Sequence, residues 1–115
     1  TYCSSKPYTI LRKKENMTTD SIRVALQISL LGEIYPDIRA IAYSYDLSNK
    51  IFTLRYYLVR EPIEEDYENV SIVLAEFASN FNHTSFNGLK EECIYSKVPK
   101  SELDSLDGFV YFRKE

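Results

Sequence analysis

The stretch "IRAIAYSYDLSNKIFTLRYYLV" (residues 38–59) decides the fold. Apolar or aromatic side chains occupy every second position through much of it, as in strands that bury one face. The first strand, 38–46, divides into Ile38, Ala40 and Ala42 on one face and Arg39, Ile41, Tyr43 and Tyr45 on the other; the second, 50–59, places Phe52, Leu54, Tyr56 and Leu58 together. The turn-forming residues "DLSN" (46–49) between them predict a β-hairpin.

A helix is predicted on each side of this hairpin. The segment 18–37 has an N-cap at Thr19 or Asp20, and Gly32 is placed to end the helix in a left-handed conformation. Its broad apolar stripe consists of Ile22, Val24, Ala25, Leu26, Ile28 and Leu31. The segment 63–81 follows Pro62 and carries an apolar row formed by Tyr67, Val70, Leu74, Phe77 and Phe81.

Two further strands are predicted, at 89–98 and 109–115, with a loop at 99–108 between them. The order of elements is then α-β-β-α-β-β, and we expect an α+β fold in which two helices cover a four-stranded sheet as a two-layer sandwich. The short hairpin connections favour a mainly antiparallel sheet. Residues 17–115 are predicted to form a single domain, and the leader, residues 1–16, is expected to be flexible, as terminal segments often are.

Charge is distributed unevenly along the chain. The leader holds four bases and one acid, whereas residues 17–115 hold ten bases and sixteen acids, a net charge of −6. Nucleic acid repels such a domain and basic partners attract it, so we expect protein partners and no direct binding of nucleic acid.

The sequence also gives expectations about the compartment. It has no run of eighteen apolar residues that would span a membrane, and no apolar segment typical of a secretory signal near its start. Its two cysteines, Cys3 and Cys93, form no disulfide framework, which favours a reducing cytoplasm. Cys93 lies in an alternating stretch and is expected to be a small core residue.

No motif for catalysis or for cofactor binding stands out. The only histidine, His83, lies in a polar loop, and the three glycines are scattered rather than gathered in a phosphate-binding loop. No set of histidines and cysteines has zinc spacing. We therefore expect neither an enzyme nor a bound cofactor or metal ion.

Five carboxylates gather in "REPIEEDYE" (60–68), at the predicted start of the second helix. The helix macrodipole favours acids in the first turn by about 0.3–1 kcal/mol each at the surface. Helix stabilisation needs only one or two of them, and the others repel one another, so we predict that the segment also belongs to an acidic docking surface. The candidate partner-binding residues are Glu61, Glu64, Glu65, Asp66, Glu68, Tyr57, Asp104 and Asp107.

Three segments, in this order, resemble a set of small bacterial toxin-immunity proteins, as in contact-dependent growth inhibition and colicin-type systems: "SLLGEIYPDIRAIAYSYD", "FTLRYYLVREPIEEDYENVS" and "ELDSLDGFVYFRKE". The resemblance covers residues 18–115 and omits the leader. It implies a cytoplasmic, non-enzymatic inhibitor that binds one cognate toxin domain, often a nuclease, and blocks its active site or substrate surface. A nuclease must be basic to hold nucleic acid, so an acidic inhibitor gains association rate from electrostatic steering.

A second hypothesis is a small regulatory or adaptor module with another protein partner. Such a module could form a homodimer through a tyrosine-rich strand edge, because tyrosine suits interfaces and the chain has ten of them. A toxin domain encoded immediately upstream of this gene would favour the immunity protein over the adaptor.

From the sequence alone, reversal of Glu65 and Asp66 to Lys is expected to weaken partner binding and flatten its salt dependence, because both are placed on the acidic surface. Thermal stability is expected to fall little. A titration and a thermal melt of the double variant check both parts, and an unchanged association rate and affinity would remove the segment from the interface.

Overall fold

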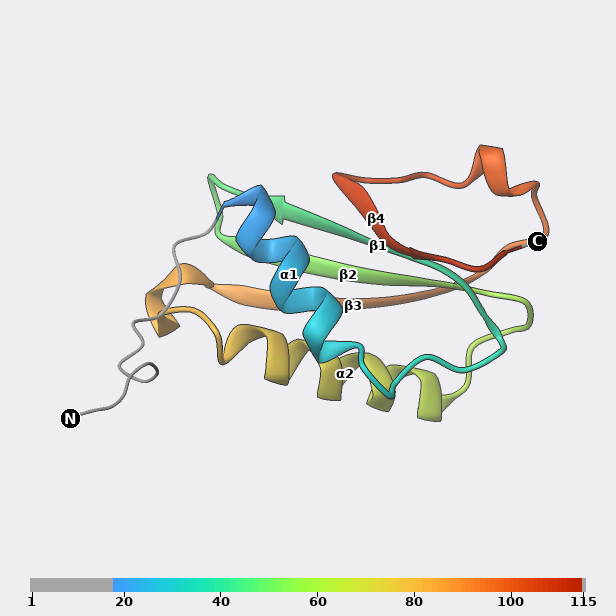
Figure 1. The fold of residues 1–115 in the computed structure, drawn as a ribbon, viewed down its shortest axis with the longest axis horizontal. Coiled ribbons are helices and arrows are strands. Elements are labelled where there is room, and N and C mark those ends of the chain that lie inside the picture. The colour runs from blue at the N-terminus through green and yellow to red at the C-terminus, as the bar shows by residue number, and fades with distance from the viewer. Residues whose placement is uncertain (1–17, 115) are drawn as a thin grey trace.

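The computed structural model describes residues 18–114 and arranges them as two helices packed on a four-stranded sheet (Figure 1). The helices are α1 (Thr19–Ser29) and α2 (Glu64–Ala78), and the strands are β1 (Ile38–Asp46), β2 (Ile51–Leu58), β3 (Gly88–Tyr95) and β4 (Gly108–Phe112). Single 3-10 turns, η1 (His83–Ser85) and η2 (Lys100–Glu102), precede β3 and β4. The α+β class and the order of elements are confirmed, whereas the leader lies outside the described residues.

The sheet is mixed, with the strand order β3-β2-β1-β4. β1 pairs antiparallel with both β2 and β4, but β3 pairs parallel with β2 along its whole length, from Gly88 opposite Ile51 to Tyr95 opposite Leu58. The cause is α2, which carries the chain back along the sheet so that β3 starts at the same end as β2. The expectation of a mainly antiparallel sheet is therefore not confirmed, because it considered the short hairpin and not this crossover.

A β-bulge decides which residues of β1 face the helices. Between Ile38 and Ala40 the register advances two residues in β1 for one residue in β2, so Arg39 is the extra residue. Ile38 consequently joins Ile41 in the core beneath the helices, whereas strict alternation had placed it beside Ala40 and Ala42. The bulged Arg39 is buried and donates from Nη1 to the carbonyls of residues 96 and 98, each at 2.9 Å.

The main core lies between both helices and one face of the sheet. Its β2 members are the four residues that the sequence placed on one face, Phe52, Leu54, Tyr56 and Leu58. The ring of Phe52 stacks on that of Phe77 from α2, with centroids 4.4 Å apart. Cys93 of β3 is buried in this core as predicted, and burial raises the pKa of its thiol to about 12.

The opposite face of the sheet is covered by the connection between β3 and β4. Leu103 of this connection packs with Ala40, Ala42 and Tyr57, and the small alanine side chains leave room for it. The hydroxyl of Tyr57 donates to the carbonyl of Asp104 at 2.7 Å. The middle of the sheet is therefore buried on both faces, rather than on one face as a simple two-layer sandwich would be.

α1 is shorter than predicted and only half of its apolar stripe is buried. It begins after Thr18, whose hydroxyl accepts from the Ser21 amide at 3.1 Å, and it ends at Ser29. In the turn that follows, Gly32 has a φ of 80°, the left-handed conformation that the sequence predicted. The buried residues are Ile22, Ala25, Leu26, Ser29 and Leu30. The other half of the stripe, Val24, Ile28 and Leu31, is exposed.

We predict that Ser29→Ala stabilises the protein. Ser29 is 1% exposed, and its Oγ has no hydrogen-bond partner among the described residues, so its hydroxyl is desolvated without compensation. The free energy of unfolding, measured by urea denaturation, should rise by about 1 kcal/mol. Ser21→Ala in the same helix is the control and should instead lose about 0.5–1 kcal/mol, because Ser21 Oγ accepts from the Thr18 amide. A loss of stability in Ser29→Ala would contradict this account.

Candidate functional site

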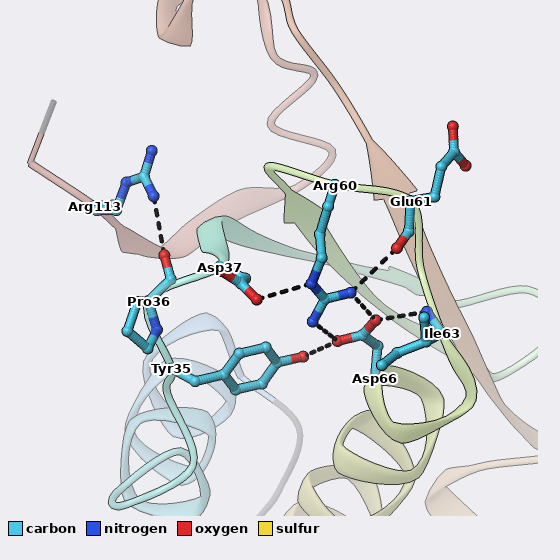
Figure 2. Close-up of polar contacts among 8 residues, drawn as sticks. All are labelled: Tyr35, Pro36, Asp37, Arg60, Glu61, Ile63, Asp66 and Arg113. Carbon is cyan, nitrogen blue, oxygen red and sulfur yellow. Dashed lines mark hydrogen bonds and ion pairs between the residues drawn. The ribbon is translucent and has the colours of Figure 1, made fainter.

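Arg60 fixes the chain between β2 and the start of α2. Its Nε donates to Asp37 Oδ2 at 2.8 Å, and Nη1 and Nη2 donate to the two carboxylate oxygens of Asp66 at 2.7 and 3.0 Å (Figure 2). This bidentate geometry is the strongest arrangement for an arginine and a carboxylate. Arg60 thereby joins the end of β2 and the first turn of α2 to the entry of β1.

Asp66 is the buried centre of this cluster. It is 1% exposed and also accepts from the Tyr35 hydroxyl at 2.5 Å and from the Ile63 amide at 2.7 Å. Ile63 precedes the helix and has no side-chain oxygen for capping, so Asp66 satisfies its amide from inside the first turn. Burial alone would raise the pKa of Asp66, but the hydrogen bonds from Arg60, Tyr35 and Ile63 lower it to about 2.

Two of the eight predicted partner-binding residues therefore lie inside the protein. Asp66 is committed to Arg60, and Tyr57 is buried under the β3–β4 connection. Reversing Asp66 to Lys would place a cation beside Arg60 in a buried site, so stability would fall substantially, contrary to the expectation from the sequence. Neither side chain is available to a partner at the surface.

The structure also separates Asp104 and Asp107 from the acidic segment at α2. Asp104 Oδ1 accepts from the Leu106 amide at 2.9 Å, within the connection that covers the opposite face of the sheet. Asp107 Oδ2 accepts from the Tyr45 amide at 2.8 Å, near the last residues of β1, whereas Asp37 and Arg60 lie at the first residues of that strand. Both aspartates are exposed, but they do not form one surface with the start of α2.

The remaining four candidates are close together in the sequence, within residues 61–68. Glu61, Glu64, Glu65 and Glu68 are all exposed, and among residues 18–114 none of them makes an ion pair with a base. α2 itself contains no lysine or arginine. Arg60, the nearest base in sequence, is already engaged by Asp37 and Asp66. We call these four glutamates the acidic patch; the positive end of the α2 dipole favours its negative charge.

The sequence interpretation missed the role of Arg60. A signal was present: Arg60 precedes Pro62, and an acid stands at the third position of the helix that follows, where a side chain can reach back to the N-cap amide. Composition could not separate Asp66 from its three neighbouring glutamates. Only the helical turn decides that Asp66 points inward while Glu64, Glu65 and Glu68 point outward.

Between residues 18 and 114, no three or more His, Cys, Asp or Glu side chains are grouped so that they could hold a metal ion. In the same part of the chain, no helix has the length and apolar character needed to cross a membrane.

We predict that Asp66→Asn destabilises the protein and changes its response to acid. Because the pKa of Asp66 is lower in the folded state than its ordinary value near 3.8, the ionised carboxylate stabilises the fold above that value, and this contribution is lost as the pH falls toward 2. Asp66→Asn should lose about 2–4 kcal/mol of unfolding free energy at pH 7.

The difference between wild type and Asp66→Asn should shrink between pH 4 and pH 2, as measured by urea denaturation across that range. The neighbouring exposed Glu65→Gln serves as the control and should stay within about 0.5 kcal/mol of wild type at pH 7. A difference that is independent of pH would mean that the ionised carboxylate is not the stabilising species.

A family model described as MafI2 immunity protein matches residues 19–115, which is the whole chain apart from the leader and the two residues after it. No curated protein matches the chain. The resemblance of the three quoted segments to toxin-immunity proteins is thus confirmed at the level of the family.

Proposed function

This chain belongs to the MafI2 immunity protein family, and we propose that it neutralises one cognate toxin domain, a basic nuclease, by binding it and blocking its substrate surface. The observation that carries the proposal is the family match across residues 19–115. An inhibitor of this kind needs a surface for its toxin and not a catalytic centre, so the proposed mechanism is non-enzymatic. It would act in the cytoplasm of the cell that makes the toxin, as in contact-dependent growth inhibition.

The choice of a nuclease rests on charge. Residues 18–114 hold ten bases and fifteen acids, a net charge of −5. A nuclease holds its polyanionic substrate through lysine and arginine side chains, and this requirement makes its substrate surface basic. An acidic protein is therefore complementary to the surface that must be blocked.

The acidic patch supplies the charges for this attraction. Its four carboxylates have no base beside them among the described residues, so an approaching cation need not displace an existing ion pair. Exposed charges of this kind raise association rates from about 10⁵–10⁶ M⁻¹s⁻¹ toward 10⁸ M⁻¹s⁻¹ or more at low salt. Rapid capture matters for an immunity protein, because free toxin acts until it is bound.

The proposal is tested by titrating the full chain against the toxin domain encoded beside its gene, at about 50 and about 200 mM salt. We expect nanomolar or tighter binding, about −12 kcal/mol or stronger, which weakens at the higher salt concentration through a slower association rate. The double variant Glu65→Lys with Glu68→Lys should associate more slowly and lose most of this salt dependence.

Glu102→Lys is the control for charge reversal elsewhere on the protein. Glu102 is an exposed acid on η2, in the connection that covers the opposite face of the sheet. Its association rate and salt dependence should match those of wild type, apart from the effect of the changed net charge. Tight binding without salt dependence would support the immunity function but would contradict a basic nuclease as the target. No binding at micromolar concentration would reject the toxin assignment in favour of the adaptor module.

A further inference from the structure

α1 is apolar on two faces, of which the core uses only one. Val24 and Ile28 are four residues apart and lie on one face of α1, and Leu31 follows in the turn just after the helix. Their side chains are 55%, 55% and 75% exposed, although Ile22 and Leu26 on the inner face are buried. A surface helix normally has a polar outer face, and an aligned row of exposed aliphatic side chains is typical of a binding surface. We call Val24, Ile28 and Leu31 the apolar row.

The row borders a groove against α2. Val24 and Ile28 line a cavity of about 410 Å³ together with Asp20 and with Asn80, which lies just beyond the end of α2. In Figure 1, α1 lies in front of the sheet, and no described element lies in front of it. Thr18 and Ser21 also line this cavity, and its aliphatic side, formed by Val24, Ala25 and Ile28, could accept an apolar side chain from a partner.

The exposed side of α2, the helix that packs beside α1, is acidic. The exposed side of α2 presents Glu65, Glu68 and Glu76, together with Ile72, which is 57% exposed. The single base of the two helices is Arg23, and its Nη1 donates to the carbonyl of Phe109 in β4 at 3.1 Å. Over the described helices, the outer surface thus combines an apolar row with carboxylates and no unengaged base.

We propose that the apolar row and its groove form the centre of the toxin-docking surface, with the acids of α2 on its rim. This inference rests on the proposed function and specifies the surface and the chemistry of the partner. The toxin domain would place an aliphatic or aromatic side chain in the groove and lysines or arginines against Glu65, Glu68 and Glu76. The apolar contact would govern the lifetime of the complex, while the rim charges govern its formation.

Charge favours this occupant over a second copy of the chain. In a dimer formed by this surface, the glutamates of one copy would face or flank those of the other, and such like-charge contacts oppose association. A basic toxin domain instead gains from the same glutamates.

The test uses the full chain, with the toxin domain encoded beside its gene as the probe. Ile28→Gln with Leu31→Gln should weaken binding by about 30-fold or more, mainly through faster dissociation, and should leave the salt dependence unchanged. The Glu65→Lys, Glu68→Lys variant has the opposite signature, with slower association and altered salt dependence. Because all four residues are exposed, thermal melts should show that each variant is folded.

Val59→Gln is the first control, because Val59 is 38% exposed and lies just after β2, where it lines a different cavity with Arg39 and Tyr95. A second control, Val98→Gln, changes an exposed valine in the connection between β3 and β4. Both should dissociate from the toxin domain like wild type.

The outcomes separate the two proposals. If wild type binds the toxin domain and Ile28→Gln with Leu31→Gln dissociates at the same rate, the docking surface lies elsewhere and the immunity function stands. If wild type does not bind, both proposals fail. If the free protein sediments as a dimer that this double variant disrupts, the row is an interface between copies. If Ile10→Gln with Leu11→Gln in the leader tightens toxin binding, the leader competes for the row and the proposed open surface is wrong.

Discussion

The ion pair between Arg60 and Asp66 joins parts of the chain that are far apart in the sequence. It connects the end of β2 to the first turn of α2, and through Asp37 and Tyr35 it holds the segment between α1 and β1. Removing Asp66 from water is costly, and the bidentate arginine, the tyrosine hydroxyl and a backbone amide compensate for that cost. This arrangement fixes the chain where it leaves β2 and enters α2.

The same ion pair determines which acids remain for a partner. Because Arg60 is engaged by Asp37 and Asp66, it is not available to Glu61, Glu64, Glu65 or Glu68. A charged side chain that already has a partner contributes little to steering, since its field is largely cancelled nearby. The acidic segment thus contains one structural carboxylate and four exposed ones. Because the backbone at the start of α2 is already fixed, a partner that bound the exposed acids would lose little free energy in ordering it.

The exposed acids and the apolar row would act on different steps of binding. Charges act over about 8–10 Å at ordinary salt and therefore affect the encounter between proteins. Aliphatic contacts act only when water is excluded, so they affect how long a complex lasts. An inhibitor of a toxin requires both fast capture and slow release, and the proposed docking surface would combine the two.

Local patterns in the sequence determined the hairpin, both helices, the burial of Cys93 and the class of fold, because side-chain periodicity is set by backbone geometry within a few residues. The quoted segments also identified the toxin-immunity family. Tertiary structure alone decided the rest: the bulge at Arg39, the parallel pairing of β3, the burial of Asp66 and the exposure of Val24, Ile28 and Leu31. Each of these depends on what lies opposite a residue in space. A periodic pattern shows that a face is apolar or charged. It does not show whether another element of the fold packs against that face.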